Sequence, residues 1–299
     1  MFGMGGEFPY FQCRSCGCLQ IAQVPAEMGQ YYPRNYYSYH LEPVNRQGLR
    51  ARLAGKRDYA NLTGTRWLGA WLPRANSMRL DVASLASLPM RPNMKVLDVG
   101  CGKGQLLSVL HRAGFRKLWG VDPYLSADVE VVPGLVVRRQ SLESLEEDFD
   151  LIMLHHVFEH LEDGRKALAD CRMRLRPDGQ ILIRIPTVDS TAWEKYRENW
   201  VDLDAPRHFF LHSRRSLALL AGQAGLAVER TWCDSTDFQF TGSEVYASGG
   251  SLYAKSGEQV PMEQRFTPEQ LAEFAREAEA LNAAERGDQF AAVLVRAHS

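Results

Sequence analysis

The sequence predicts an α/β fold built from βαβ units, and two stretches carry this prediction. Residues 96–99 read as a short buried strand, the glycines at 100, 102 and 104 interrupt it, and residues 105–113 carry leucines at helical spacing. Strand, glycine turn and helix form the start of a βαβ unit, in which the backbone passes close to a ligand. Residues 150–154 form another apolar strand, which delivers the polar segment 155–160 to its carboxyl end, where open α/β sheets bind ligands.

The glycine turn predicts a site for an amino acid attached to a nucleoside. Its backbone N–H groups and the helix N-terminus would bind a carboxylate, and Asp98 would bind an ammonium group. Asp122 ends a predicted second strand and falls about twenty residues beyond the glycines, where a ribose-binding carboxylate is expected. A dinucleotide would require a third glycine where Gln105 stands, so a nicotinamide oxidoreductase is the less favoured alternative.

The chain resembles the class I S-adenosylmethionine-dependent methyltransferases, in particular the small-molecule branch that includes ubiquinone-biosynthesis-like and polysaccharide-associated enzymes. The matching residues are 96–104, 120–123, 149–161 and 175–179, with an echo at Pro206-Arg207-His208. The resemblance implies a Rossmann-like sheet of seven strands, mostly parallel with an antiparallel last strand. It also implies S-adenosyl-L-methionine as cofactor, S-adenosyl-L-homocysteine as product, and cofactor contacts at Asp98, Gly100, Cys101, Gly102, Gly104, Asp122, Pro123, Ser141, Leu142 and His155.

Three histidines are candidates for the catalytic base. Methyl transfer to a hydroxyl requires a proton acceptor, and a histidine titrates near neutral pH. We expect His160 and His208 to be the first candidates and His156 the next, with Glu159 orienting one of them. The alternative for His208 is a structural role in holding a lid. The segment also spells HxxEH, a zinc-protease pattern that requires one continuous helix; because it follows a strand here, we predict no such site and name no metal ligands. A weaker metal role stays open, because the resemblance implies a glutamate where His156 stands in relatives of the ubiquinone type.

The N-terminal segment carries half of a zinc-binding pattern. Cys13, Cys16 and Cys18 lie close together, but a closed structural zinc site requires four ligands and no second CxxC exists. Improvised ligands would be Cys18 or His40. We predict a degenerate zinc-ribbon-like hairpin without zinc. The tyrosines of residues 31–39 either line the cleft or pack on a neighbouring helix, and both alternatives stay open.

Length and composition set the organisation and the class of partner. The 299 residues are expected to form an N-terminal Cys/Tyr-rich segment with helices (1–90) and a methyltransferase domain (91–299) with a lid (186–213) and an insertion (235–287). A formal net charge of -1 gives no general attraction to nucleic acid. Six irregularly spaced cysteines and the lack of a long apolar run favour a soluble, cytoplasmic enzyme without a membrane span.

The predicted function is S-adenosylmethionine-dependent methylation of a small molecule by base-assisted, in-line transfer. Aromatic residues of the lid suggest a sugar or another ring-bearing acceptor. The acceptor itself, the atom that is methylated and the oligomeric state are left open. The alternative is a non-catalytic S-adenosylmethionine-binding subunit that regulates or scaffolds a partner.

Overall fold

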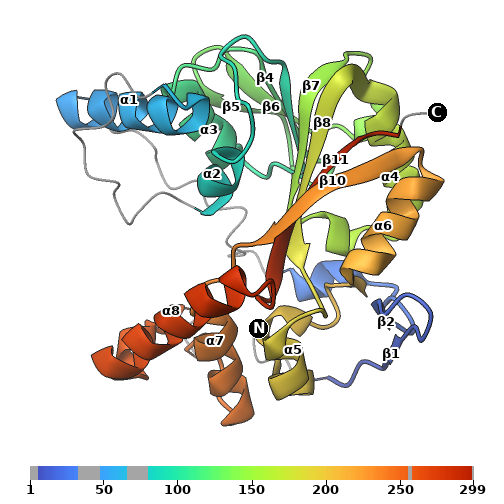
Figure 1. The fold of residues 1–299 in the computed structure, drawn as a ribbon, viewed down its shortest axis with the longest axis vertical. Coiled ribbons are helices and arrows are strands. Elements are labelled where there is room, and N and C mark those ends of the chain that lie inside the picture. Colours follow the sequence, from blue (N-terminus) through green and yellow to red (C-terminus); the bar gives the residue numbers. More distant parts are fainter. Residues whose placement is uncertain (1–5, 33–47, 66–79, 255–257, 298–299) are drawn as a thin grey trace. The chain divides into compact units, whose positions relative to one another are not determined.

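The computed structural model describes residues 6–32, 48–65, 80–254 and 258–297 (Figure 1). Residues 33–40 of the tyrosine-rich segment, His40 among them, therefore lie outside the described residues. The chain forms two compact units, which we name after the predicted site residues that they contain. The glycine-loop unit comprises Tyr36–His155, Lys166–Leu182 and Leu294–Ser299, and the histidine unit comprises Met1–Asn35, His156–Arg165 and Ile183–Val293.

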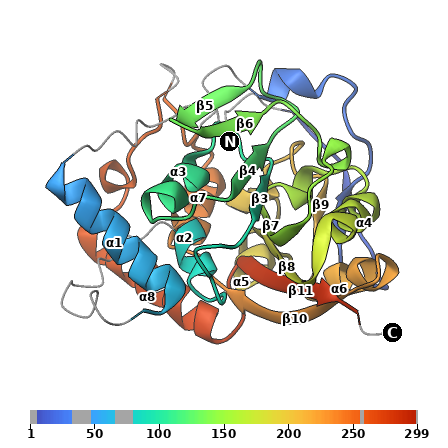
Figure 2. The same ribbon diagram turned by 90° about the horizontal axis from the view of Figure 1, so that it is seen from above.

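The glycine-loop unit is a parallel sheet with helices, as its sequence predicts. Strand β3 pairs in parallel with β4 and with β7, and β4 pairs in parallel with β6. The strand order is β8-β7-β3-β4-β6-β5, and α1 packs beside α3 (Figures 1 and 2). The elements are α1 (Leu49–Thr63), α2 (Leu80–Leu85), β3 (Val96–Val99), α3 (Gln105–Arg112), β4 (Leu118–Val121), β5 (Val129–Val132), β6 (Leu135–Arg138), β7 (Phe149–His155), α4 (Gly164–Arg174) and β8 (Leu175–Pro186).

Two features of this unit differ from the expectation. Among the described residues, the sheet that contains these six strands together with β10 and β11 has eight strands rather than seven. The additional strand is β5, which forms an antiparallel hairpin with β6 around Gly134 at φ 83°. Residues 177–179 spell Pro-Asp-Gly, which is typical of a turn and predicts that the strand begins only after them; this prediction is wrong, because β8 runs through these residues without interruption. Turn-forming residues are a local preference, and the pairing of a long strand overrides it here.

The histidine unit combines a small sheet, helices and the remaining strands. Its small sheet has the order β1-β2-β9, and β10 neighbours β11, which neighbours β8. Strands β8 and β11 contribute residues to both units. The elements are β1 (Tyr10–Gln12), β2 (Leu19–Ile21), α5 (Thr191–Tyr196), β9 (Phe210–Leu211), α6 (Arg214–Gln223), β10 (Leu226–Cys233), α7 (Phe238–Ala247), α8 (Pro268–Ala283) and β11 (Gln289–Arg296).

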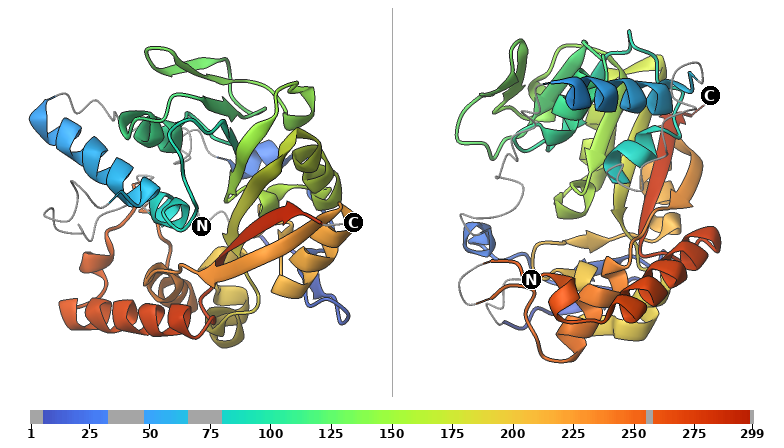
Figure 3. Two further views of the ribbon diagram at one scale, coloured as in Figure 1. Left: turned by 45° about the horizontal axis from the view of Figure 1, so that its top comes forward. Right: turned by 90° about the vertical axis from the view of Figure 1, so that its left-hand side faces the viewer.

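Helices α7 and α8 lie side by side in the histidine unit (Figures 1 and 3). Helix α8 begins with a capping box in which Thr267 and Gln270 satisfy each other's backbone N–H groups, and Pro268 follows the cap. Phe240 of α7 stacks on Phe274 of α8 with ring centroids 5.6 Å apart. Helix α7 was not expected, because its residues show no clear helical period, and its burial comes from this packing.

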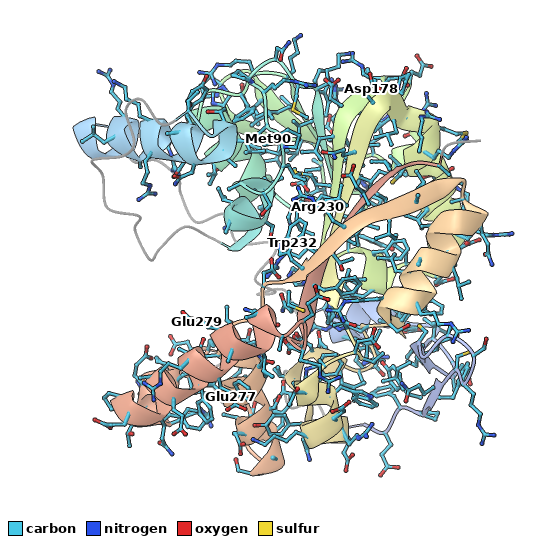
Figure 4. The ribbon with its side chains drawn as sticks, viewed as in Figure 1. Met90, Asp178, Arg230, Trp232, Glu277 and Glu279 are labelled. Atoms are coloured by element: carbon cyan, nitrogen blue, oxygen red, sulfur yellow. The ribbon has the colours of Figure 1, made fainter. Side chains whose placement is uncertain are left out.

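Strand β10 carries a cation–π pair, and helix α8 carries two glutamates that are seen in the same view. The guanidinium of Arg230 lies 5.2 Å from the ring centroid of Trp232, two residues further along β10 (Figure 4). Glu277 and Glu279 lie on α8 in the same view. No helix in the described part of the chain has the length and apolar character that crossing a membrane requires.

Candidate active site

The glycine turn between β3 and α3 is built from residues with left-handed backbone. Gly100, Gly102 and Gly104 have φ values of 68°, 52° and 79°, a region that side chains disfavour. At Gly104 a Cβ atom would also lie 2.7 Å from Val131 and 2.8 Å from Val137. The turn therefore depends on glycine both for its backbone angles and for the close approach of its neighbours.

Most of the turn's N–H groups bind within the protein, which corrects the expectation that they are bare. Gly100 and Cys101 donate to the carbonyl of Val121 at 2.8 and 3.2 Å, and Gly104 donates to Cys101 at 2.9 Å. No side chain caps the N-terminus of helix α3, and the N–H groups in the first turn of a helix point out of its N-terminal end. An anion would therefore bind at the start of α3.

Two buried carboxylates flank this turn. Asp122 accepts hydrogen bonds from the N–H of Gly102 at 3.0 Å and of Tyr124 at 2.9 Å. Burial raises the pKa of Asp122, although these two bonds act in the opposite direction. Asp98 is buried at the end of β3. Burial, with Asp98 and Asp122 nearby, raises the pKa of the Cys101 thiol, so this cysteine is a neutral group in the turn.

The other expected cofactor residues are distributed over the ends of neighbouring strands. Pro123 follows Asp122 and is exposed, and His155 is the last residue of β7. Leu142 is buried in a single 3₁₀ turn, and Ser141 precedes it. The side chain of Ser141 makes no capping hydrogen bond, so its hydroxyl does not serve as a plain helix cap.

The histidine unit brings together the three predicted histidines around Glu159. The carboxylate of Glu159 is fully buried, and Oε1 lies 3.5 Å from Nδ1 of His156. One ligand atom from each of Glu159, His160 and His208 lies within 4.8 Å of the other two. The rings of His160 and His208 meet edge to face, with centroids 4.8 Å apart. We call Glu159, His160 and His208 the Glu–His cluster.

Backbone carbonyls fix the tautomers of two cluster histidines. Nδ1 of His160 lies 2.8 Å from the carbonyl oxygen of Arg207, and Nδ1 of His208 lies 2.7 Å from that of Asp202. A carbonyl only accepts, so each Nδ1 carries the proton. In the neutral form of each ring Nε2 therefore presents a lone pair.

Burial and charge set the protonation of the cluster. Burial opposes ionisation of Glu159, but the contact with His156 and the nearby His160 and His208 lower its pKa to about 2. Burial, aided by His160, lowers the pKa of His208 to about 4. His208 is therefore a neutral imidazole near pH 7, and Glu159 is a buried carboxylate.

His156 is held by a chain of side chains that sequence reasoning missed. Its backbone has φ 53°, and its Nε2 accepts a short hydrogen bond from Arg184, whose Nε donates to Asp234 at 2.6 Å. Arg184 and Asp234 are separated by fifty positions in sequence, so no local pattern points to them. Only a single 3₁₀ turn, Phe158–His160, follows His156. As expected, the HxxEH segment does not form one helix.

A second unpredicted pair supports His208. Asp204 pairs with Arg207, and its Oδ2 lies 3.7 Å from Nε2 of His208. Burial opposes ionisation of Asp204, but His208 and Arg207 lower its pKa. The sequence signal for this pair was the segment that runs from Asp204 to His208, which named both residues but not their pairing.

The three N-terminal cysteines lie on the β1–β2 hairpin as free thiols. The N–H of Gly17 donates to the carbonyl of Cys13 at 2.8 Å, and backbone N–H groups of Cys16 and Ser15 lower the pKa of the Cys13 thiol. Cys18 is buried, with Sγ 3.8 Å from Nδ1 of His212. The prediction that this hairpin lacks zinc stays a prediction.

The geometry agrees with what comparisons with known proteins find. The chain matches a family model described as "Methyltransferase domain" over residues 70–231. It is 32% identical over 124 residues to the mitochondrial ubiquinone biosynthesis O-methyltransferase of Bos taurus, covering 37% of this chain and 33% of that protein. It is 28% identical over 106 residues to the trans-aconitate 2-methyltransferase of Deinococcus radiodurans, covering 34% of this chain and 41% of that protein.

The chain is also similar to an uncharacterised protein and to a solved methyltransferase structure. An uncharacterised 37.1 kDa transposon protein of Streptomyces fradiae is 28% identical over 165 residues, covering 48% of this chain and 46% of that one. The chain thus spans less than half the length of these three relatives. A methyltransferase structure from Mesorhizobium loti aligns with a TM-score of 0.43 at 17% identity, covering 72% of this chain and 99% of that one.

The predicted family and fold class are confirmed. The parallel sheet, the glycine turn at the end of β3 and the acid at the end of β4 are those of a Rossmann-like fold. The family model covers more than half of the 299 residues. The chain belongs to the methyltransferase-domain family.

Proposed function

We propose that this enzyme methylates a hydroxyl group of a small, ring-bearing molecule. Two kinds of support exist for the hydroxyl: relatives are named as O-methyltransferases, and the histidine unit carries histidines with Nε2 lone pairs beside a buried carboxylate. The Glu–His cluster is the observation that carries the proposal, because a hydroxyl must lose its proton when it is methylated.

In this proposal the glycine-loop unit holds S-adenosylmethionine. Asp98 binds the ammonium group, and the start of α3 binds the carboxylate. Asp122 accepts hydrogen bonds from the ribose hydroxyls. It can do so because each of its two oxygens accepts only one backbone hydrogen bond in the structure and keeps a further lone pair. The other proposed contacts are Gly100, Cys101, Gly102, Gly104, Pro123, Ser141, Leu142 and His155. The glycines fit this role, since a side chain at Gly104 would collide with its neighbours.

The bound cofactor supplies a methyl group on a positively charged sulfur. The protein's own task is to align the acceptor oxygen with that methyl, to exclude water and to take up the acceptor's proton. The oxygen forms the new O–C bond while the C–S bond breaks and its electron pair returns to sulfur. The acceptor's proton passes to the histidine that acts as base.

His160 is the best-suited base of the three candidates. It is partly exposed, its Nδ1–H is anchored on Arg207, and its Nε2 lone pair can accept a proton. A pKa of about 4 makes His208 a weak proton acceptor near pH 7. Nε2 of His156 already accepts a hydrogen bond from Arg184, so His156 would orient Glu159 rather than take the proton.

The test combines cofactor binding with single turnovers. Calorimetry should give one S-adenosylmethionine site per chain, and a panel of ring-bearing hydroxyl compounds should yield S-adenosylhomocysteine with at least one of them. At saturating cofactor, H160Q should lower kcat by about a hundredfold or more, as loss of a general base does, while cofactor binding stays unchanged. Unaltered rates in H160Q, H208Q and H156Q would refute the base, and absence of cofactor binding by folded protein would refute the whole proposal.

A further inference from the structure

We propose that Glu159, His160 and His208 bind one divalent transition-metal ion such as Zn²⁺. Their ligand atoms lie within 4.8 Å of one another, and they come from two segments, His156–Arg165 and Ile183–Val293, of the same compact unit. Zinc commonly takes three protein ligands of the imidazole and carboxylate kind and leaves one position open. This site is distinct from the cysteine hairpin.

The carboxylate of Glu159 supplies the first independent support. It is 0% exposed, and within the part of the chain that the structure describes neither oxygen has a hydrogen-bond partner. His156 contacts it at 3.5 Å, which is longer than a good hydrogen bond. A buried carboxylate with only this one long contact to a donor among the described residues is costly, and a cation among the cluster's ligand atoms would supply a closer partner.

The orientation of the two imidazoles is the second support. A metal-bound histidine usually donates its other ring N–H to a carboxylate or a backbone carbonyl, which fixes the ring and its tautomer. Both cluster histidines do so: His160 donates to the carbonyl of Arg207 and His208 to that of Asp202. The nitrogen atoms left with lone pairs, Nε2 of each ring, are the ones that metals bind.

The chemistry of the ligand set points to the class of ion. Asp204 lies 3.7 Å from Nε2 of His208, so a second carboxylate faces the cluster. Arg207 pairs with Asp204. Two imidazoles and one carboxylate suit zinc and related transition metals, whereas magnesium and calcium prefer ligand sets made of oxygen.

A bound ion would change how the acceptor is activated, and this consequence alone rests on the proposed function. With His160 bound to the metal, its Nε2 has no lone pair for the acceptor's proton. An acceptor hydroxyl in the open coordination position would instead lose its proton to solvent more easily, as zinc-bound water does.

Metal binding is tested without reference to activity. The untagged, chelator-treated protein of 299 residues is titrated with Zn²⁺ by calorimetry. The titration uses a C13S/C16S background because thiolates also bind zinc. One site per chain is expected, with at least tenfold weaker binding in E159Q and in H208Q. E162Q, which changes an exposed glutamate three residues further on, is the matched control and should bind as the parent does.

Cobalt substitution identifies the ligands independently. Bound Co²⁺ should show visible absorption bands of a nitrogen–oxygen site and no thiolate charge-transfer band. If E159Q does not fold, H160Q, whose side chain is partly exposed, takes its place. Binding that vanishes with C13S/C16S, or binding equal to the parent in E159Q, H160Q and H208Q, would overturn the site. Cofactor binding and methyl transfer, measured on the same samples with and without added Zn²⁺, would still report separately on the proposed function.

Discussion

The buried carboxylate of Glu159 lies 3.5 Å from Nδ1 of His156, and Arg184 donates to the other nitrogen of the same ring. Because Nε2 of His156 accepts from Arg184, the proton of this ring lies on Nδ1 and faces Glu159. Asp234, Arg184, His156 and Glu159 thus form a continuous polar chain that ends at His160 and His208. Glu159 is where this chain meets the cluster.

Glu159→Gln should therefore lower kcat at saturating S-adenosylmethionine. The amide keeps the shape of the side chain but removes its negative charge, and we expect a loss of about tenfold to a hundredfold, as for other groups that orient an active-site residue. Single-turnover formation of S-adenosylhomocysteine measures it.

The control for this substitution is Glu162→Gln, which lies in the same segment and is exposed. It should leave kcat within twofold of the parent. An E159Q enzyme that folds and turns over at the parent rate would show that the buried charge plays no part in the reaction.

Asp122→Asn should weaken S-adenosylmethionine binding. An asparagine side chain has one oxygen, so one of the N–H groups of Gly102 and Tyr124 would face an NH₂ group instead of an acceptor. Charge-assisted hydrogen bonds are worth about 1.5–3 kcal/mol, which corresponds to roughly a tenfold to hundredfold rise in Kd. Calorimetry measures it, with the exposed Asp178→Asn (Figure 4) as control; equal affinities in both variants would contradict the role of Asp122.

The sequence predicted those parts of the molecule that depend on local pattern. Strand β3, the three glycines and α3 follow from apolar spacing and turn chemistry, and the structure confirms them. The partners of the predicted residues were not predictable, because Arg184 and Asp234 meet only when two distant strands are placed. The tautomers of His160 and His208 were not predictable either, because they depend on the backbone carbonyls of Arg207 and Asp202, whose positions only the folded chain defines.

Errors in the expected fold have the same origin. Helix α7 is held by its packing against α8, where Phe240 stacks on Phe274. Its own sequence has no helical spacing of apolar residues that would predict it. The Pro-Asp-Gly residues of β8 resemble a turn locally but belong to a long strand. In both places tertiary contacts outweigh local preference.

Gly104→Ala should destabilise the protein more than Gly134→Ala. Both glycines have positive φ, at 79° and 83°, so each substitution carries a similar backbone cost of about 1 kcal/mol. At Gly104 the new Cβ also meets Val131 at 2.7 Å, whereas at Gly134 no atom lies within 4 Å. Overpacking adds about 1–3 kcal/mol, and urea unfolding measures the difference. Equal losses would show that the valines move aside freely.

Asp202→Asn should remove part of the pH dependence of stability. Asp288 accepts from Trp200 at 2.9 Å, and Asp202 accepts from Gln289 at 3.1 Å. Burial raises the pKa of both carboxyls, and the charge of Asp288 raises that of Asp202 further. The folded state therefore keeps protons that the unfolded chain releases near pH 4, so stability contributed by the pair is present at low pH and falls as pH rises.

In the Asp202→Asn protein one of the two buried charges is absent at every pH. The amide oxygen can still accept from Gln289, and the NH₂ group can donate to Asp288, so the hydrogen bonds survive. Between pH 5 and pH 8 the free energy of unfolding should fall less in this variant than in the parent. The difference between the two proteins should be about 1.4 kcal/mol for each unit by which folding raises the pKa of the Asp202 carboxyl. Urea titrations at several pH values measure this, with Asp178→Asn as control. A fall as steep as that of the parent would mean that Asp202 and Asp288 do not share a proton in the folded protein.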